Sequence, residues 1–199
     1  TQFPKWVGRC TSCGEWNTVV EEIVQKEEKR NWKQTSTVKK VAKALKIHEI
    51  TASQEDRINT NNGELNTVLG GGLVKGSVVL LGGEPGIGKS TLLLQIALMM
   101  KNKVLYVSGE ESQSQIKLRA ERLEGIQHEC LILTETNTQN IFKIIEESEP
   151  DIVVIDSIQT LYTDYIDASP GSISQIRETA AELIKFAKET NTPVVLIGH

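Results

Sequence analysis

The chain predicts an α/β fold with a mostly parallel sheet flanked by helices, and two observations carry this prediction. From Gly63 onward, short apolar runs alternate with longer segments in which apolar residues recur at helical spacing. The apolar runs are almost continuous, which is typical of parallel strands that helices cover on both faces.

The predicted elements alternate regularly between strand and helix. Strands are expected over residues 77–83, 103–109, 130–135, 151–157 and 192–198. Helices are expected over residues 89–100, 112–123, 137–149 and 172–190. Because parallel strands cannot be joined by tight hairpins, each helix is expected to be the crossover between two strands.

Three zones of different composition divide the chain. Residues 1–22 contain two tryptophans and two cysteines but little apolar periodicity, so something other than a large core must hold them. Residues 23–57 are rich in Lys, Glu, Gln and Thr and predict a linker with one strand-like piece near its end. Basic residues outnumber acidic ones from Lys26 to Lys46, which fits either a solvated tether or a segment that contacts DNA. Residues 58–199 form the predicted α/β core.

Bulk properties are those of an ordinary globular protein. The chain has 199 residues, 39% hydrophobic and 24% charged residues, and a formal net charge of -4. No apolar run approaches the roughly 18 to 20 residues of a membrane span, so no membrane partner is expected. Three unevenly placed cysteines do not form a secreted disulfide framework, which favours a cytoplasmic location. Mild acidity does not exclude nucleic acid, because a basic surface can be local or can arise in a ring.

Residues 83–90 match the phosphate-binding pattern G-x-x-x-x-G-K-[ST] between a predicted strand and a predicted helix. Glycines let backbone N–H groups turn toward a phosphate chain, and the helix N-terminus adds its positive dipole. Lys89 can reach the outer phosphates, the Ser90 hydroxyl can hold magnesium, and Thr91 can contact the inner phosphates. A glycine-rich turn that binds nothing is the alternative. The other residues of the predicted ATP-binding loop are Gly83, Glu84, Pro85, Gly86, Ile87 and Gly88.

A triphosphate site also needs acidic residues at neighbouring strand ends. Asp156 follows four apolar residues and is the candidate magnesium partner. Glu110 and Glu111 follow the second predicted strand. In P-loop ATPases similar to recombinases and ring helicases the water-activating glutamate lies at this strand end, which favours Glu110 as a catalytic residue beside Lys89, with Glu111 in support. The alternative is that both carboxylates only stabilise the next helix N-terminus.

Three further polar residues lie at or just after predicted strand ends. His199 closes the last strand, where this class often carries a sensor of the terminal phosphate, and a strand terminus without a role is the alternative. Gln159 and Thr160 follow the strand of Asp156, where such proteins have loops that face a polymer. We therefore expect Gln159 and Thr160 to face DNA.

Five blocks of the sequence together resemble one family. They are PKWVGRCTSCGEWNTVVEE (4–22), LNTVLGGGLVKGSVVLLGGEPGIGKSTLLLQIA (65–97), VLYVSGEESQSQIKLRAERL (104–123), VVIDSIQT (153–160) and GSISQIRETAAELIKFAKET (171–190). In this order they resemble the bacterial RadA family of DNA repair proteins, also called Sms, whose members are recombinase-like ATPases. The cysteine and tryptophan block joined to an ATPase core is more specific than any single motif.

The resemblance implies an N-terminal four-cysteine zinc finger, a ring-forming ATPase core and a C-terminal domain similar to that of Lon proteases. It implies a DNA-dependent ATPase of DNA repair and homologous recombination, of helicase type, that drives branch migration with ATP, Mg²⁺ and Zn²⁺. Implied partners are single-stranded DNA, branched DNA, a recombinase protein and further copies of the chain in a homo-hexamer. By the same resemblance Lys89, Ser90 and Asp156 hold nucleotide and magnesium, and Glu110 activates water.

Departures from the family pattern concern the two ends of the chain. Cys10 and Cys13 match the second C-x-x-C pair of the zinc finger, but a closed zinc site takes four ligands and the first pair is absent from these 199 residues. Residues 1–22 are therefore expected to be a partial finger, with a redox dithiol and a remnant without function as alternatives. The chain begins with Thr1 rather than Met and stops at the end of a predicted strand, so both ends are expected to be truncated, with the family's lysine-rich signature and Lon-like domain following His199. Cys130, inside a predicted strand, is expected to be a buried apolar residue.

Two other functions compete with the DNA motor. The glycine-rich block is shared by proteins similar to the circadian KaiC ATPases, in which nucleotide controls assembly, but the cysteine and tryptophan block argues against that switch. A zinc-stabilised binding module with a degenerate nucleotide site conflicts with the complete set of nucleotide and catalytic residues. Stimulation of ATP hydrolysis by single-stranded DNA separates the motor from the switch.

Overall fold

The computed structural model of the chain describes residues 14–16, 46, 49, 56–123 and 129–198. Cys10, Cys13, His199 and nearly all of the predicted linker lie outside the described residues, and so do the predictions made for them. Among the described residues, no helix combines the length and apolar character that crossing a lipid bilayer requires.

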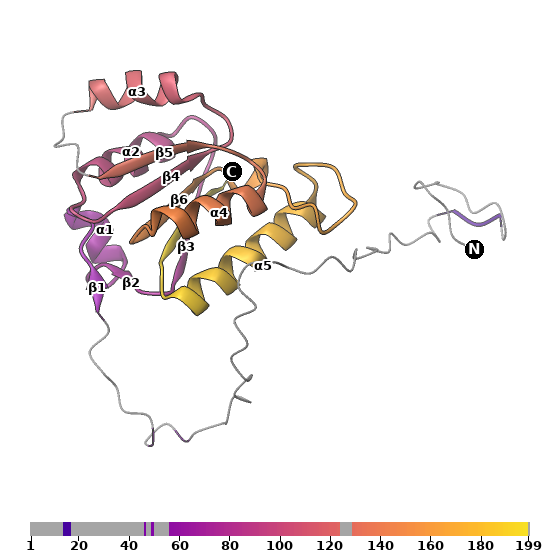
Figure 1. Cartoon of the computed structure of the whole chain (residues 1–199), viewed down its shortest axis with the longest axis horizontal. Helices are drawn as coiled ribbons and strands as arrows, with labels where there is room; N and C mark the ends of the chain where they lie inside the picture. The colour runs from indigo at the N-terminus through magenta and orange to yellow at the C-terminus, as the bar shows by residue number, and fades with distance from the viewer. Residues whose placement is uncertain (1–13, 17–45, 47–48, 50–55, 124–128, 199) are drawn as a thin grey trace.

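A five-stranded sheet forms the centre of the core (Figure 1). Its strands are β3 Val78–Gly82, β4 Val104–Ser108, β5 Cys130–Thr134, β6 Ile152–Asp156 and β7 Val194–Gly198. They lie in the order β3-β7-β6-β4-β5, and every neighbouring pair is parallel. The predicted α/β fold is confirmed, and each predicted strand overlaps an observed one.

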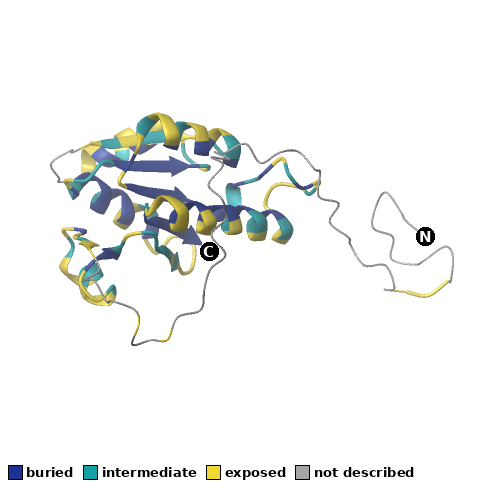
Figure 2. Cartoon of the chain, turned by 60° about the horizontal axis from the view of Figure 1, so that its bottom comes forward, coloured by how far each residue is buried: buried dark blue, intermediate teal, exposed yellow. Residues whose placement is uncertain are grey.

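In the described part of the chain, four helices cover the two faces of this sheet. They are α2 Lys89–Met99, α3 Gln113–Arg122, α4 Thr138–Ser148 and α5 Ile173–Thr190. Helices α2 and α3 pack on one face and α4 and α5 on the other, each pair with its own apolar core. Figure 2 shows the strands buried between the two helical layers. This burial on both faces explains why the strands read as continuous apolar runs.

Alternate residues of a strand serve the two cores. In β4, Val104 and Tyr106 belong to the core under α2 and α3, whereas Leu105 belongs to the core under α4 and α5. Successive side chains of a strand point to opposite faces of the sheet, so this division follows from strand geometry. As a result, Tyr106 faces the helical layer that contains the start of α2.

A small antiparallel unit precedes the sheet and was not predicted in detail. The strand β1 Arg57–Ile58 pairs with β2 Leu73–Val74, and α1 Gly63–Val68 lies between them. The Asn62 side chain caps α1 by accepting a 2.8 Å hydrogen bond from the Leu65 N–H. Strands of two residues are too short for any periodicity, so the sequence showed only a strand-like piece near the end of the linker.

Candidate nucleotide-binding site

The predicted site residues meet at the carboxyl ends of the parallel strands. The strand register pairs Gly82 with Gly198 and Ser108 with Asp156, so the segments that follow β3, β4 and β6 leave the sheet at one edge. A pocket of about 310 Å³ opens there, a size within the usual range for small-molecule sites. Its lining residues are Pro85, Gly86, Gly88, Lys89, Ser90, Thr91, Glu110, Arg119, Asp156 and Ile197.

The loop between β3 and α2 forms one wall of this pocket. Gly86 and Gly88 have φ values of 82° and 97°, in the left-handed region that glycine adopts at little cost. Gly88 is the residue before α2, and the helix starts without a hydrogen bond from a side-chain cap. The first N–H groups of a helix lack intrahelical partners and carry the positive end of the helix dipole. This wall is therefore suited to an anion.

The Lys89 side chain lies inside the loop. Lys89 is 8% exposed, and its Nζ donates hydrogen bonds of 2.8 Å to the Gly83 carbonyl and 2.7 Å to the Glu84 carbonyl. These two bonds hold the positive charge of Lys89 at the pocket. The other loop residues, including Ile87, are exposed. A lysine whose ammonium group lies at an anion site is the residue that a triphosphate-binding loop requires.

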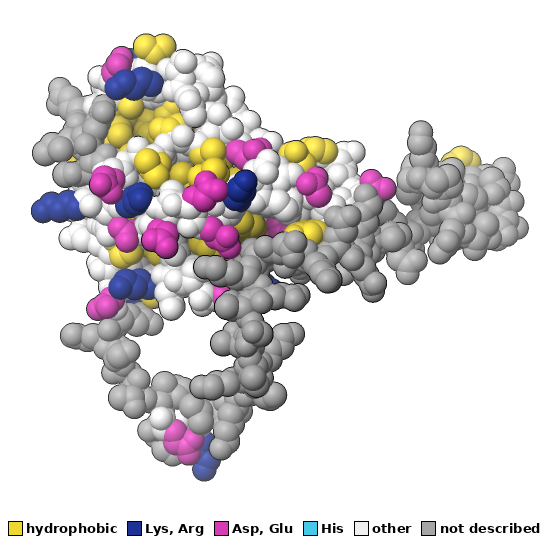
Figure 3. All heavy atoms as spheres, in the orientation of Figure 1, with side chains coloured by type: hydrophobic (Ala, Val, Ile, Leu, Met, Phe, Trp, Pro, Cys, Tyr) yellow, Lys and Arg dark blue, Asp and Glu magenta, His cyan; other side chains and the backbone are white. Residues whose placement is uncertain are grey.

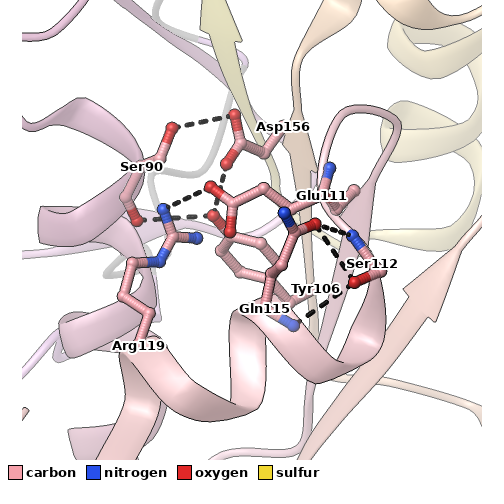
Figure 4. A network of polar contacts seen from close by, with 8 residues as sticks. Ser90, Tyr106, Glu111, Ser112, Gln115, Arg119 and Asp156 are labelled. Carbon is pink, nitrogen blue, oxygen red and sulfur yellow. Dashed lines mark hydrogen bonds and ion pairs between the residues drawn. The ribbon is translucent and has the colours of Figure 1, made fainter. Parts of the chain in front are cut away.

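A carboxylate lies opposite the start of α2 (Figure 4). Ser90 Oγ donates a 3.0 Å hydrogen bond to Asp156 Oδ1, and the Tyr106 hydroxyl donates a 2.6 Å hydrogen bond to Asp156 Oδ2. Asp156 is 6% exposed. Magnesium prefers oxygen ligands such as carboxylates, and in P-loop ATPases the Ser or Thr of the loop and a strand-end Asp hold it, a pair that Ser90 and Asp156 provide. Ser90 and Asp156 therefore fit a magnesium ion.

Tyr106 is a site residue that the sequence did not reveal. It lies in β4 and is completely buried. Burial, followed by the negative charge of Asp156 and the hydrogen bond to it, raises the pKa of Tyr106 well above its ordinary value. The phenol is therefore a neutral donor at physiological pH, and it orients the Asp156 carboxylate. In the sequence it looked like one more apolar residue of a buried strand.

Glu110 projects from the segment that follows β4. Its side chain is exposed at the pocket, and its Oε1 accepts a 2.8 Å hydrogen bond from Ser157 Oγ. The Gly109 N–H also donates to the Asp156 carbonyl at 2.9 Å. These contacts hold Glu110 beside the end of β6, within the pocket that Lys89 and Asp156 line. The role of Ser157 was not predicted.

Glu111 points to a different partner. Its Oε1 accepts a 2.9 Å hydrogen bond from Arg119 Nη1, and the two side chains form an ion pair. Glu110 and Glu111 both precede the helix cap at Ser112, whose hydroxyl and backbone N–H exchange hydrogen bonds with Gln115 in a capping box. The cap fixes the start of α3, so that Arg119 lies about two turns on and reaches the pocket. Arg119 was not predicted as a site residue because the sequence of its helix is typical of an exposed, charged segment.

Other predicted residues lie outside the pocket lining. Gln159 and Thr160 are part of a short 3-10 helix, η2 Ile158–Thr160, and both are half-buried. Thr160 Oγ1 donates a 2.7 Å hydrogen bond to the Ser157 carbonyl. Their expected contact with DNA stays a prediction.

Cys130 differs from its prediction. It begins β5 and is half-buried rather than buried, because β5 lies at the edge of the sheet. It still packs against the apolar core under α2 and α3. Burial raises the pKa of its thiol to about 11, which fits an unreactive packing residue.

Comparison with known families agrees with this geometry. Residues 44–199 match the family described as the AAA domain, and residues 1–21 match the rubredoxin metal binding domain. The chain belongs to the AAA domain family. Membership of this family, together with the loop of residues 83–90, makes the described residues 56–123 and 129–198 part of a P-loop ATPase.

Curated relatives extend the similarity over the entire chain. The chain is 51% identical to the DNA repair protein RadA of Bacillus subtilis, 46% identical to that of Streptococcus pyogenes and 43% identical to that of Pseudomonas aeruginosa. The alignments cover at least 99% of this chain and 44% of each relative. The resemblance to the RadA family that the sequence predicted is confirmed. The chain spans less than half the length of these relatives.

Proposed function

We propose that this protein is a DNA-dependent ATPase of DNA repair and homologous recombination. The observation that supports the ATPase part is the pocket in which Lys89, Ser90, Glu110 and Asp156 lie together. The DNA repair part is supported by the similarity to proteins named DNA repair protein RadA. Both parts agree with membership of the AAA domain family.

In this proposal, different pocket residues bind the phosphates and the magnesium ion. The loop of residues 83–88 and the first N–H groups of α2 bind the phosphates, and Thr91 contacts the inner ones. Lys89 leaves the Gly83 and Glu84 carbonyls to meet the outer phosphates. Ser90 and Asp156 hold magnesium, which when bound neutralises phosphate charge.

Glu110 is the proposed catalytic base. Its carboxylate is exposed at the pocket and is oriented by Ser157. A carboxylate held in this way can accept a proton from water as the water attacks the terminal phosphate. Lys89 stabilises charge on the outer phosphates during the same step.

The assembly and the DNA chemistry belong to the whole protein and are proposals as well. We propose a homo-hexameric ring in the cytoplasm that couples hydrolysis to helicase-type branch migration on single-stranded DNA or branched recombination intermediates, together with a recombinase protein. Figure 3 displays one face of the chain, where acidic and basic side chains are interspersed. A face of mixed charge is a poor track for a polyanion, so in this proposal DNA contacts another face or a surface created in the ring.

The decisive experiment measures steady-state ATP hydrolysis by the protein with and without single-stranded DNA. The DNA-motor proposal expects DNA to raise kcat, and expects Lys89→Ala to abolish nucleotide binding or turnover. Glu110→Gln should keep ATP affinity and lower kcat about 100-fold or more. Lys101→Ala and Glu146→Gln, two exposed positions outside the pocket, are the matched controls and should behave as wild type.

Two results would overturn parts of this proposal separately. Normal turnover by Glu110→Gln would remove Glu110 from its role. Steady hydrolysis that does not respond to DNA would favour a nucleotide-controlled assembly switch over a motor. A DNA four-way junction assay then tests branch migration directly.

We propose a zinc site for residues 1–22, with Cys10 and Cys13 as ligands. The match of residues 1–21 to the rubredoxin metal binding domain supports a metal, and thiolate pairs at this spacing suit Zn²⁺. Metal analysis of purified protein should find zinc that Cys10→Ser with Cys13→Ser removes. Protein without zinc and with two rapidly exchanging thiols would favour a redox dithiol.

A further inference from the structure

Arg119 lines the nucleotide pocket, and part of its guanidinium group has no hydrogen-bond partner among the described residues. The Arg119 side chain is only 14% exposed. Nη1 is bonded to Glu111, but Nε and Nη2 are buried and have no hydrogen-bond partner among the described residues. In Figure 4 the group extends from α3 toward Ser90 and Glu111.

Buried donors without acceptors are unfavourable, particularly on a group that stays charged. The large majority of buried side-chain polar atoms in proteins have a hydrogen-bond partner, and arginine does not lose its proton at physiological pH. One carboxylate, Glu111, balances the charge but uses only one side of the guanidinium. The arrangement therefore calls for an anionic acceptor that approaches from the pocket.

The position of Arg119 points to one part of a nucleotide. Arg119 lines the same pocket as Ser90, Glu110 and Asp156, and its Nη1 is bonded to Glu111. Asp156 and Ser90 form the candidate magnesium site, and Glu111 follows the candidate base Glu110 directly in sequence. Arg119 thus lies at the end of the pocket where magnesium and attacking water are expected, which is the end of the terminal phosphate.

We propose that Arg119 binds the terminal phosphate of ATP through Nε and Nη2, and that Glu111 is the residue that positions it. The inference rests on the proposed ATP site and deepens it. Two parallel N–H groups of arginine match two phosphate oxygens, a bidentate contact that lysine cannot reproduce. ADP lacks this phosphate, so Arg119 makes the pocket selective for ATP over ADP, and Glu111 acts on Arg119 rather than on water.

The test compares two affinities, one for a non-hydrolysable ATP analogue and one for ADP, in the same protein. Arg119→Ala should weaken binding of the analogue about 10- to 100-fold and change ADP affinity less than about 3-fold. Arg119→Lys keeps the charge and should recover only part of the loss. Glu111→Gln should weaken the analogue selectively but by a smaller factor, about 3- to 10-fold. Arg122→Ala, an exposed arginine one turn further along α3, is the matched control and should leave both affinities unchanged.

The possible results of the affinity measurements lead to different conclusions about Arg119. Equal weakening of the analogue and ADP, with a lower melting temperature, would make Arg119 a structural residue and overturn the inference. Unchanged affinities in Arg119→Ala would also overturn it, while leaving the ATP site intact. If the wild-type protein binds neither nucleotide, the proposed function itself fails. If Arg119→Ala does not fold, the analogue-to-ADP ratios of Arg119→Lys and Glu111→Gln decide, and ratios equal to wild type would reject the contact.

Discussion

Ser157 Oγ donates a 2.8 Å hydrogen bond to Glu110 Oε1, although the two residues lie 47 positions apart in the sequence. Glu110 follows β4, and Ser157 comes directly after Asp156 at the end of β6. The bond therefore ties the candidate base to the strand that carries the candidate magnesium ligand. Because β4 and β6 are neighbours in the sheet, this tie depends on the strand order and not on any local motif.

Removing this tie should impair turnover but not binding. In Ser157→Ala, Glu110 loses the hydrogen bond that orients it, which contributes only about 1 kcal/mol because the Glu110 carboxylate is exposed to water. We expect kcat to fall about 3- to 10-fold and the affinity for ATP to stay the same. Steady-state kinetics and a direct nucleotide titration measure both quantities. Ser114→Ala, on the exposed side of α3, serves as control, and a kcat equal to wild type in Ser157→Ala would show that Glu110 needs no such orientation.

The hydrogen bond between Tyr106 and Asp156 should stabilise the folded chain. Tyr106→Phe leaves the buried carboxylate without one of its two hydroxyl donors, and bonds to charged groups contribute about 1.5 to 3 kcal/mol. We expect the free energy of unfolding in urea to fall by about that amount. Tyr162→Phe, at a half-buried tyrosine away from the pocket, should change it much less. Equal stability of Tyr106→Phe and wild type would contradict this account.

Close packing of Gly109 against Thr160 should couple the segment of Glu110 to η2. A Cβ atom on Gly109 would overlap the Thr160 side chain, so Gly109→Ala should destabilise the fold by about 1 to 3 kcal/mol and lower kcat by displacing Glu110. Adding Thr160→Gly removes the overlap and should recover part of both losses. Calorimetry and kinetics of the two single variants and the double variant provide the test. Strict additivity of the two substitutions would argue against a direct contact.

Cys130 should react slowly in the folded chain. With its pKa raised to about 11 by burial, only about one thiol in a thousand is ionised at pH 8, and the thiolate is the reactive form. We expect alkylation by iodoacetamide, followed by mass spectrometry of the Cys130 peptide, to be at least about 10-fold slower in buffer than in urea. The rate in buffer should rise as the pH approaches 11. Similar rates in buffer and urea would mean that the thiol is exposed.

The elements that were predicted well have strong local patterns. The strand of Asp156 shows an unbroken apolar run, and α5 shows clear amphipathic spacing. The unit of β1, α1 and β2 was missed because its pieces are too short for periodicity. Cys130 was expected to be buried but is half-buried, because a run of apolar residues does not say whether its strand lies at the centre or the edge of the sheet.

The residues of the candidate site also fall into two groups, those that the sequence predicted and those that it did not. Residues 83–91 could be named because a phosphate loop needs particular residues at consecutive positions. Asp156 and Glu110 could be named because polar residues after apolar strands stand out, and because of the family resemblance. Tyr106 and Arg119 could not, since one looks like a core residue and the other like a surface charge until their partners are known.

Local patterns in the sequence were sufficient to predict the succession of strands and helices, the phosphate loop and the candidate acidic residues at the strand ends, because each of these depends on residues close together in the chain. The strand order could not be predicted in this way: β7 separates β3 from β6, and β4 lies beside β6. That order brings Ser90 to Asp156 and Glu110 to Ser157, and the packing of α3 turns Arg119 toward the same pocket. The reason is physical: the neighbours of a strand or helix are chosen by burial of its apolar faces against distant segments, and no local pattern specifies that choice.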